Sequence, residues 1–140
     1  MTTIFADANA GVMVCDSKAS AGDSWFPCTK VRRVGDELVG FAGMYVEGER
    51  WLKWYAGGQK GPRPSIENSV ALILGPQGLR MLESSGNGIA IERGFHGVGS
   101  GGTCAIAAFM AGADAERAVH IACDIDTGSG GQIHVHKLEG

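Results

Sequence analysis

Long apolar runs are absent from this sequence of 140 residues. No stretch approaches the roughly 18 consecutive apolar residues of a membrane-spanning helix, so we expect no membrane interaction. A basic charge excess is absent too. The formal net charge is −3, and because nucleic-acid-binding proteins are normally basic, we expect no nucleic-acid partner. The first residues lack the basic and long apolar segments of a secretory signal, which favours a cytoplasmic location.

Several chemical motifs are also missing. The four cysteines, at positions 15, 28, 104 and 123, lack the C-x-x-C spacing of a zinc site, so we expect reduced thiols and no metal site. His134 and His136 share one face of a predicted strand, and we interpret them as a surface pair. Neither the phosphate loop G-x-x-x-x-G-K-[ST] nor the nucleophile elbow G-x-S-x-G occurs. We therefore expect no cofactor.

Glycine is abundant instead. The chain has 23 glycines, about 16% of its residues against a usual level of roughly 7%. They show no three-residue period, which excludes a collagen-like chain. The length is that of one ordinary domain, and neither a long linker nor an internal repeat divides it. We therefore expect a single domain over residues 1–140.

Hydrophobic periodicity and turn residues predict blocks of strands separated by helices. The predicted strands cover residues 4–6, 11–16, 30–34, 37–41, 69–74, 78–83, 89–91 and 132–138. The predicted helices cover residues 44–55, 103–111 and 115–123. Asp114 is well placed as the N-cap of the last helix, and Gly35-Asp36 as a two-residue hairpin turn. Segregated strand and helix blocks indicate an α+β fold with two antiparallel sheets covered by helices.

The segment Gly97–Gly102 (GVGSGG) contains a literal G-x-G-x-x-G before a predicted helix. In dinucleotide-binding folds that helix leads to a parallel strand followed by an acidic residue. Here it leads to a second helix, so we reject nucleotide binding. We interpret the segment as a tight strand-to-helix turn whose backbone must approach another part of the chain closely.

Thr2 is the best candidate nucleophile in the sequence. It follows Met1 directly, and methionine aminopeptidases remove Met before small residues such as Thr. Removal would place an α-amine and a hydroxyl on one residue, and an amine with a reference pKa of about 7.7–8.0 can take the hydroxyl proton near neutral pH. Taken alone, however, Thr2-Thr3 fits an ordinary strand start far better than it fits a nucleophile.

Six blocks give the sequence a family resemblance. They are Met1-Thr2-Thr3-Ile4, Gly11–Gly22 (GVMVCDSKASAG), Lys30–Arg33 (KVRR), Val39–Gly43 (VGFAG), Gly97–Gly102 and Ala118–Val135 (AVHIACDIDTGSGGQIHV). In this order and spacing the chain resembles the proteasome β-subunit superfamily of N-terminal-nucleophile (Ntn) hydrolases, and most of all the HslV-like peptidases. The blocks cover both ends of the chain and leave the middle unmatched.

The resemblance implies roles for individual residues. Thr2 would be the nucleophile once Met1 is removed, and Lys30 would be the buried lysine whose charge helps activate it. Asp16 would be the acidic partner that keeps Lys30 charged, since an unpaired buried ammonium is costly. Gly40 would supply the backbone N–H that stabilises the oxyanion. Ser100 would be the serine of the glycine-serine-glycine loop near the nucleophile.

A further pair would support the amine of the nucleophile. Asp126 and Ser129 match the family's aspartate and serine best, while Asp124 with Thr127 fits the same spacing, so both assignments stay open. The same turn could otherwise be a plain loop or a weak cation site.

The resemblance also implies a fold and partners. It predicts a four-layer αββα sandwich, the Ntn hydrolase fold, acting on peptide or unfolded-protein substrates within a homo-oligomeric ring, with an AAA+ unfoldase as a candidate partner. Only a short Gly/Pro-rich stretch follows the first predicted helix, where family members usually have a second long helix. We therefore expect a reduced helical layer, which leaves ring size and unfoldase docking open.

The function that follows is a threonine peptidase subunit of a self-compartmentalising ring protease, provided that Met1 is removed. Two alternatives stay open: an Ntn amidohydrolase acting on a small amide, and a non-catalytic proteasome-like assembly subunit that keeps Met1. The resemblance does not carry over the cleavage specificity, because the segment between Asp16 and Lys30 is shorter than in the HslV-like group.

Overall fold

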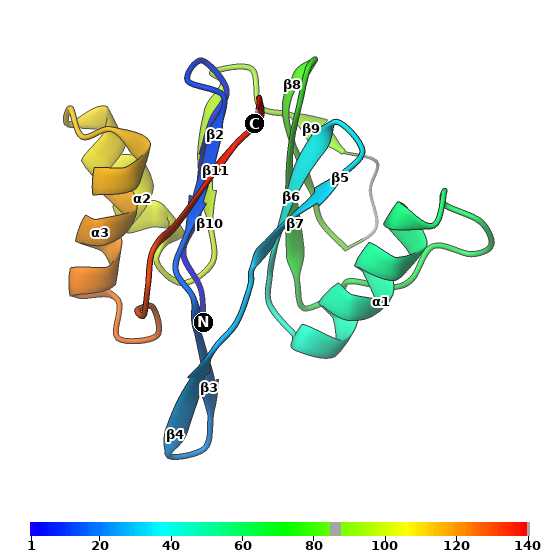
Figure 1. Cartoon of the computed structure of the whole chain (residues 1–140), viewed down its shortest axis with the longest axis horizontal. Helices are drawn as coiled ribbons and strands as arrows, with labels where there is room; N and C mark the ends of the chain where they lie inside the picture. The colour runs from blue at the N-terminus through cyan, green and yellow to red at the C-terminus, as the bar shows by residue number, and fades with distance from the viewer. Residues whose placement is uncertain (85–87, 140) are drawn as a thin grey trace.

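The chain folds into four stacked layers in the order helix pair, sheet, sheet and single helix (Figure 1). This computed structural model describes residues 1–84 and 88–139. The layers confirm the predicted α+β αββα sandwich. In the described residues, no helix combines the length and the apolar character needed to cross a membrane.

Two antiparallel sheets form the centre of the molecule. The first has, in spatial order, β10 (Phe95–Val98), β1 (Ile4–Asp7), β2 (Val12–Cys15) and β11 (His134–Lys137). The second has β5 (Val31–Val34), β6 (Glu37–Ala42), β7 (Val70–Gly75), β8 (Gly78–Leu82) and β9 (Ile89–Ala90). A separate hairpin of β3 (Lys18–Ala21) and β4 (Ser24–Pro27) projects from the body (Figure 1).

Successive side chains of β1 point to opposite faces of the first sheet, and both faces are covered. Ile4 and Ala6 point into the core between the two sheets, and Phe5 points to the opposite face. There it packs against α2 (Gly102–Met110) and α3 (Ala115–Ile125), whose small residues allow a close approach. The Asp114 carboxylate accepts the Arg117 N–H at 2.8 Å, which confirms it as the N-cap of α3.

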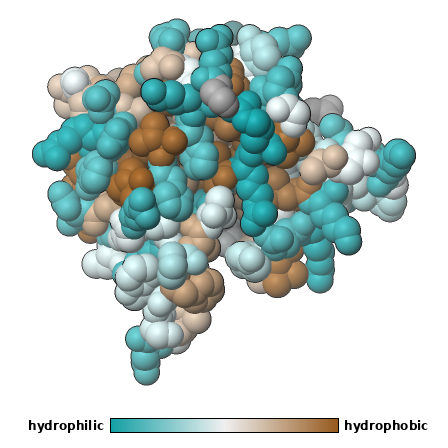
Figure 2. All heavy atoms as spheres, viewed as in Figure 1, coloured by the Kyte–Doolittle hydropathy of each residue, from teal (hydrophilic) through white to brown (hydrophobic). Residues whose placement is uncertain are grey.

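α1 (Tyr45–Ala56) covers the outer face of the second sheet, together with Ile66 of the loop that follows it. Trp51 is fully buried there, and its ring stacks on Tyr55 with the centroids 4.7 Å apart. The segment between α1 and β7 contains neither helix nor strand, which confirms the reduced helical layer. In the view of Figure 1, hydrophobic residues (brown) are visible at the surface between hydrophilic ones (teal) (Figure 2).

The predicted strands and helices match the structure to within a few residues, but two features were missed. The β3–β4 hairpin has no alternating pattern because most of its residues are exposed on both faces. The short strand β10 runs directly into the glycine-rich turn, which hides its end in the sequence. Both features bear on the site, since β10 pairs with β1 and the hairpin joins Asp16 to Lys30.

Candidate active site

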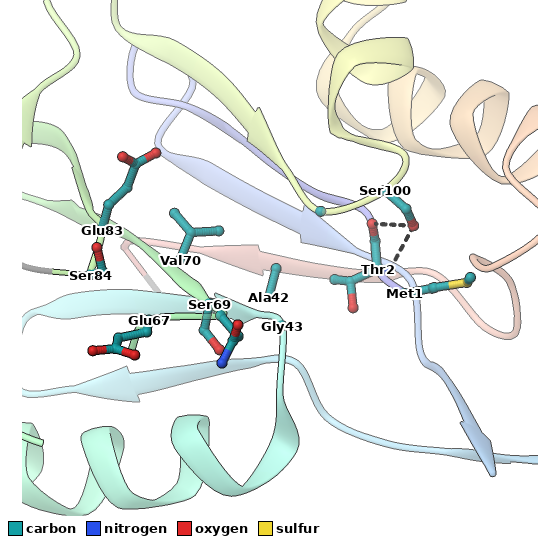
Figure 3. A pocket seen from close by; sticks show the side chains of 12 residues that line it. Met1, Thr2, Ala42, Gly43, Glu67, Ser69, Val70, Glu83, Ser84 and Ser100 are labelled. Carbon is teal, nitrogen blue, oxygen red and sulfur yellow. Dashed lines mark hydrogen bonds between the residues drawn. The ribbon is translucent and has the colours of Figure 1, made fainter. Parts of the chain in front are cut away.

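Thr2 lies just before β1, a central strand of the first sheet, and is 6% exposed. Its hydroxyl accepts a hydrogen bond from the Lys30 ammonium at 3.2 Å. Its backbone N–H donates to the Ser100 hydroxyl at 3.1 Å (Figure 3). Its carbonyl accepts the Gly101 N–H at 3.1 Å. The strand therefore fixes both the hydroxyl and the nitrogen of Thr2 against neighbouring groups.

Lys30 and Asp16 form a buried ion pair beneath Thr2. The Lys30 Nζ lies 2.9 Å from Asp16 Oδ1, and the two side chains are 7% and 0% exposed. Asp16 follows β2 and Lys30 precedes β5, so the pair joins the ends of two strands from facing sheets. A buried charge needs a partner and hydrogen bonds to be tolerated, and here each charge is the other's partner.

The Asp16 carboxylate is fully satisfied by donors. Oδ1 accepts the Thr3 N–H at 3.0 Å as well as Lys30, and Oδ2 accepts the N–H groups of Lys18 at 3.3 Å and Gly130 at 3.0 Å. Four donors around one buried carboxylate leave neither of its oxygens without a hydrogen bond. Asp16 therefore fixes the position of the Lys30 ammonium.

The three protons of the Lys30 ammonium all have acceptors. They point to Asp16 Oδ1, to Thr2 Oγ and to the Met1 carbonyl at 3.0 Å. An ammonium donates and cannot accept, so a charged Lys30 cannot take the proton of Thr2. What it can do is stabilise negative charge that develops on Thr2 Oγ.

Asp126 anchors a chain of hydroxyl groups on the other side of Thr2. Its Oδ2 accepts the hydroxyls of Ser100 and Ser129, each at 2.6 Å. Partial burial opposes ionisation of Asp126, but the hydrogen bonds from Ser100, Ser129 and the Gly128 N–H outweigh it and lower the pKa of this carboxyl. With its proton directed to Asp126, the Ser100 oxygen is left to accept the Thr2 N–H.

The bond from Ser129 to Asp126 also decides which hydroxyl donates in the contact between Thr3 and Ser129. The two hydroxyl oxygens are 2.7 Å apart, and because Ser129 donates to Asp126, Thr3 is the donor. Of the two alternatives for the supporting pair, the structure brings Asp126 and Ser129 to the site. Asp124 is exposed on α3.

The glycine-rich turn lies against the first residues of the chain. A Cβ on Gly99 would collide with the Thr2 carbonyl, and one on Gly101 with the Thr3 hydroxyl. Gly99 also has a φ of +91°, a conformation that favours glycine. The turn therefore approaches another backbone closely, as we inferred from the sequence.

Two pockets open beside Thr2. The first, of about 400 Å³, extends over the loop before β7 and is shown in Figure 3. The second, of about 240 Å³, lies between the β3–β4 hairpin and α1. Gly43, which directly follows β6, lines both. It has a φ of +131°, and a Cβ there would approach the Asn68 carbonyl to 2.5 Å.

Gly40 is not brought to these pockets. It pairs with Val31 of β5 and Leu72 of β7 in the interior of the second sheet. The structure thus gathers five of the other six predicted site residues around Thr2 and leaves Gly40 inside the sheet. Sequence reasoning missed the place of Gly43 beside Thr2, although this glycine ends the block Val39–Gly43, and it missed the part played by Thr3.

Comparisons with known proteins support the fold. No family model matches the sequence, and no curated protein matches it. Among solved structures, HslV from Trypanosoma brucei is 24% identical, with a TM-score of 0.72 over 96% of this chain and 98% of that chain. BPH from Thiobacillus denitrificans in complex with epoxomicin is 18% identical, with a TM-score of 0.74 over 98% of this chain and 99% of that chain. A second BPH structure is 17% identical, with a TM-score of 0.70 over 99% of this chain and 98% of that chain. The chain therefore has the Ntn hydrolase fold that it shares with HslV and BPH.

Proposed function

We propose that the protein is a threonine peptidase whose nucleophile is Thr2, exposed by removal of Met1. One observation carries the proposal: the Lys30 ammonium lies 3.2 Å from Thr2 Oγ while a fully buried Asp16 holds it at 2.9 Å. A fixed positive charge at a hydroxyl favours loss of the hydroxyl proton. The structure of HslV, at 24% identity, adds the fold in which such chemistry is expected.

The base is the α-amine that Thr2 gains when Met1 is removed. In the chain with Met1, the Thr2 nitrogen is an amide and has no basic lone pair. Met1 is 73% exposed, so an aminopeptidase can reach it. After removal, Ser100 can still accept one N–H of the amine, which leaves the nitrogen lone pair to receive the proton of Thr2 Oγ.

The reaction then has two halves. Thr2 Oγ attacks the scissile carbonyl carbon as its proton passes to the α-amine, and the leaving amine of the peptide takes that proton when the C–N bond breaks. This leaves an ester between substrate and Thr2. Water attacks the ester with the α-amine again acting as base, and the carboxylic acid product leaves as Thr2 Oγ regains a proton.

We assign the oxyanion donor to the Gly43 segment in place of Gly40. The backbone of Gly43 lines both pockets beside Thr2, whereas Gly40 is hydrogen-bonded into the centre of a sheet. A backbone donor of this kind contributes roughly 2.7–4 kcal/mol in other acyl-transfer enzymes.

We further propose that the subunit acts in a homo-oligomeric ring on peptides or unfolded proteins, with room for an AAA+ unfoldase partner. Trp25 and Phe26 at the projecting β3–β4 hairpin are 52% and 49% exposed. Burial of these two side chains against another chain would remove apolar surface from water. A neighbouring subunit packed against the hairpin would cover them.

Intact mass and peptide hydrolysis test the nucleophile. The expected result is loss of Met1 and hydrolysis that Thr2→Ala abolishes. Thr103→Ala, which changes an exposed threonine on α2 away from both pockets, is the matched control and keeps full activity. Peptide hydrolysis that survives in Thr2→Ala would contradict the mechanism.

Native mass spectrometry separates the alternatives. A ring with Met1 removed supports the peptidase. A monomer or dimer that cleaves small amides identifies the amidohydrolase, and an assembled protein that keeps Met1 in its own host identifies the non-catalytic subunit.

A further inference from the structure

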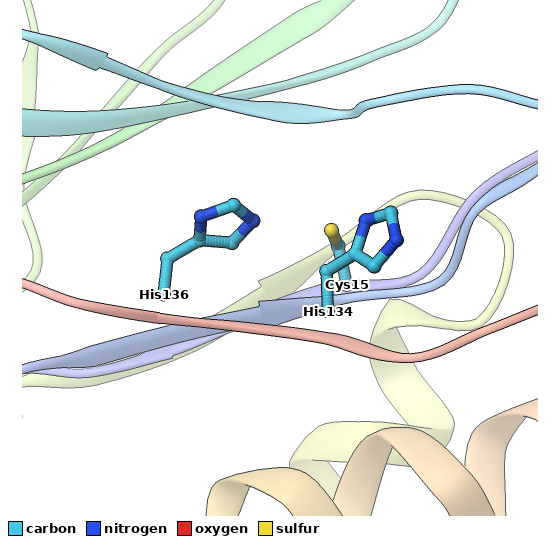
Figure 4. Close-up of side chains that lie close together, drawn as sticks. All are labelled: Cys15, His134 and His136. Carbon is cyan, nitrogen blue, oxygen red and sulfur yellow. The ribbon is translucent and has the colours of Figure 1, made fainter.

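Within residues 1–84 and 88–139, a cluster of metal-ligating side chains lies outside the proposed catalytic site. Cys15, His134 and His136 each place one ligand atom within 4.8 Å of the others' ligand atoms. The sequence favoured a surface pair for the two histidines and no role for the cysteine. The structure shows instead that all three side chains gather on one side of the first sheet (Figure 4).

The strand register explains the cluster. β11 pairs with β2 so that His134 lies directly opposite Cys15, and His136 lies opposite Met13. Alternate residues of a strand share a face, so both imidazoles lie on the face of the Cys15 thiol. That is the inner face, because Cys15 packs in the core between the two sheets.

A second observation is an unused polar atom. The Nε2 atom of His136 is buried and has no hydrogen-bond partner in the described structure. Buried polar atoms normally have a partner, and an exception requires an explanation such as an ion at that position. A ligand that bonds to this nitrogen would supply the missing interaction.

We propose that Cys15, His134 and His136 form a Zn²⁺ site that joins β11 to β2. One thiolate and two imidazoles are soft to intermediate donors that suit Zn²⁺, whereas Mg²⁺ and Ca²⁺ take oxygen ligands. Tetrahedral Zn²⁺ with bonds of 2.0–2.3 Å requires ligand atoms roughly 3.3–3.6 Å apart. Rotations that move these side chains by about 1 Å bring the cluster to that spacing.

The surroundings allow a cation to enter and stay. β11 is an edge strand and both histidines are only partly buried, whereas Cys15 is fully buried, so a cation would enter past the two imidazoles. Two cationic side chains that act electrostatically on the cluster already have partners: Lys30 is paired with Asp16, and Arg33 donates to the carbonyls of Lys137 and Leu138 at 2.6 and 3.0 Å.

Three protein ligands leave one position of the Zn²⁺ tetrahedron for water or an exchangeable ligand. The site also lies one residue from Asp16, so an ion there would fasten the end of β2 just before the carboxylate that holds Lys30. The site is independent of the proposed peptidase chemistry, because Zn²⁺ binding needs neither Thr2 nor the loss of Met1.

Metal titration of the full chain tests the proposal without an activity assay. After chelator treatment, calorimetry with ZnCl₂ is expected to give one ion per chain, and Co²⁺ to give a thiolate-to-cobalt charge-transfer band. His134→Ala and His136→Ala are expected to weaken Zn²⁺ binding at least tenfold, and Cys15→Ala to remove the band. The matched controls His120→Ala and Cys104→Ser, on α3 and α2, keep both signals.

The contrary outcomes are equally definite. Absence of saturable Zn²⁺ binding by the wild-type chain would overturn the proposal. Wild-type Zn²⁺ affinity in both histidine variants would place the ion elsewhere and overturn the proposal as well. The same holds if the thiolate-to-cobalt band is lost only in the control variants. If His136→Ala fails to fold, His136→Gln removes the imidazole while keeping a polar side chain of similar length.

Discussion

Replacement of Asp16 by Asn tests how the buried ion pair is held in place. The carboxylate accepts four hydrogen bonds, two on each oxygen, in a fully buried position. An amide offers a single acceptor oxygen, so two of the four donors would face an NH₂ group that is itself a donor. The change also leaves the Lys30 ammonium, 7% exposed, without its counter-charge.

The expected cost is large. Removing one partner of a buried ion pair typically destabilises a protein by about 3–5 kcal/mol. Folded domains are stable by only about 5–15 kcal/mol, so Asp16→Asn should lose a large part of that stability. For a chain of this length the loss corresponds to a fall in Tm of about 10–20 °C.

Urea unfolding followed by circular dichroism measures the effect. Asp124→Asn, an exposed aspartate on α3, is the matched control and should change the free energy of unfolding by less than about 0.5 kcal/mol. The double variant Lys30→Met/Asp16→Asn removes both charges, so it should be at least as stable as Asp16→Asn alone. A cost below about 1 kcal/mol for Asp16→Asn, additive with that of Lys30→Met, would refute this reasoning.

Three further outcomes are expected. Gly101→Ala should destabilise the fold by about 1–3 kcal/mol in urea unfolding, because its Cβ would collide with the Thr3 hydroxyl. In the control Gly130→Ala the Cβ makes only ordinary contacts and should cost less, so equal costs for the two variants would contradict the prediction. Burial, and after it nearby carboxylates, raise the pKa of Cys123 to about 11. The rate of Cys123 alkylation, measured by mass spectrometry, should therefore rise about tenfold per pH unit from pH 8 to 10. A plateau of this rate near pH 9 would contradict the prediction. Burial and then the hydrogen bond to Glu37 raise the pKa of Tyr55 from 10 to about 12, so the unfolded chain loses this proton first and stability falls between pH 10 and 12. Tyr55→Phe should flatten that fall in pH-dependent unfolding, and an unchanged slope would count against it.

Local patterns predict much of the fold because each signal is contained in a few neighbouring residues. The alternation of Ile4, Phe5 and Ala6 identifies a strand covered on both faces, and Gly35-Asp36 identifies a hairpin turn. The β3–β4 hairpin has no such signal, since exposed strands impose no pattern on their side chains.

The candidate site is predictable only in part, for a different reason. Thr2, Asp16 and Lys30 stand in recognisable blocks, and the structure brings them together. The choice between Gly40 and Gly43 depends on where β6 ends, and strand ends are poorly marked in a sequence. The approach of Cys15 to His134 depends on a register between strands far apart in the chain, which local periodicity does not contain.

The position of Thr2 at the very start of a central strand has a practical consequence under the proposed mechanism. A chain that keeps Met1 contains the same core and the same Lys30–Asp16 ion pair as one that has lost it, so the zymogen and the mature enzyme would give the same circular dichroism. They differ at the site, where removal of Met1 takes away the carbonyl that accepts a hydrogen bond from Lys30 and turns the Thr2 amide into a free amine. An affinity tag fused ahead of Thr2 would therefore yield a well-folded but inert preparation, and any tag belongs at the carboxyl terminus.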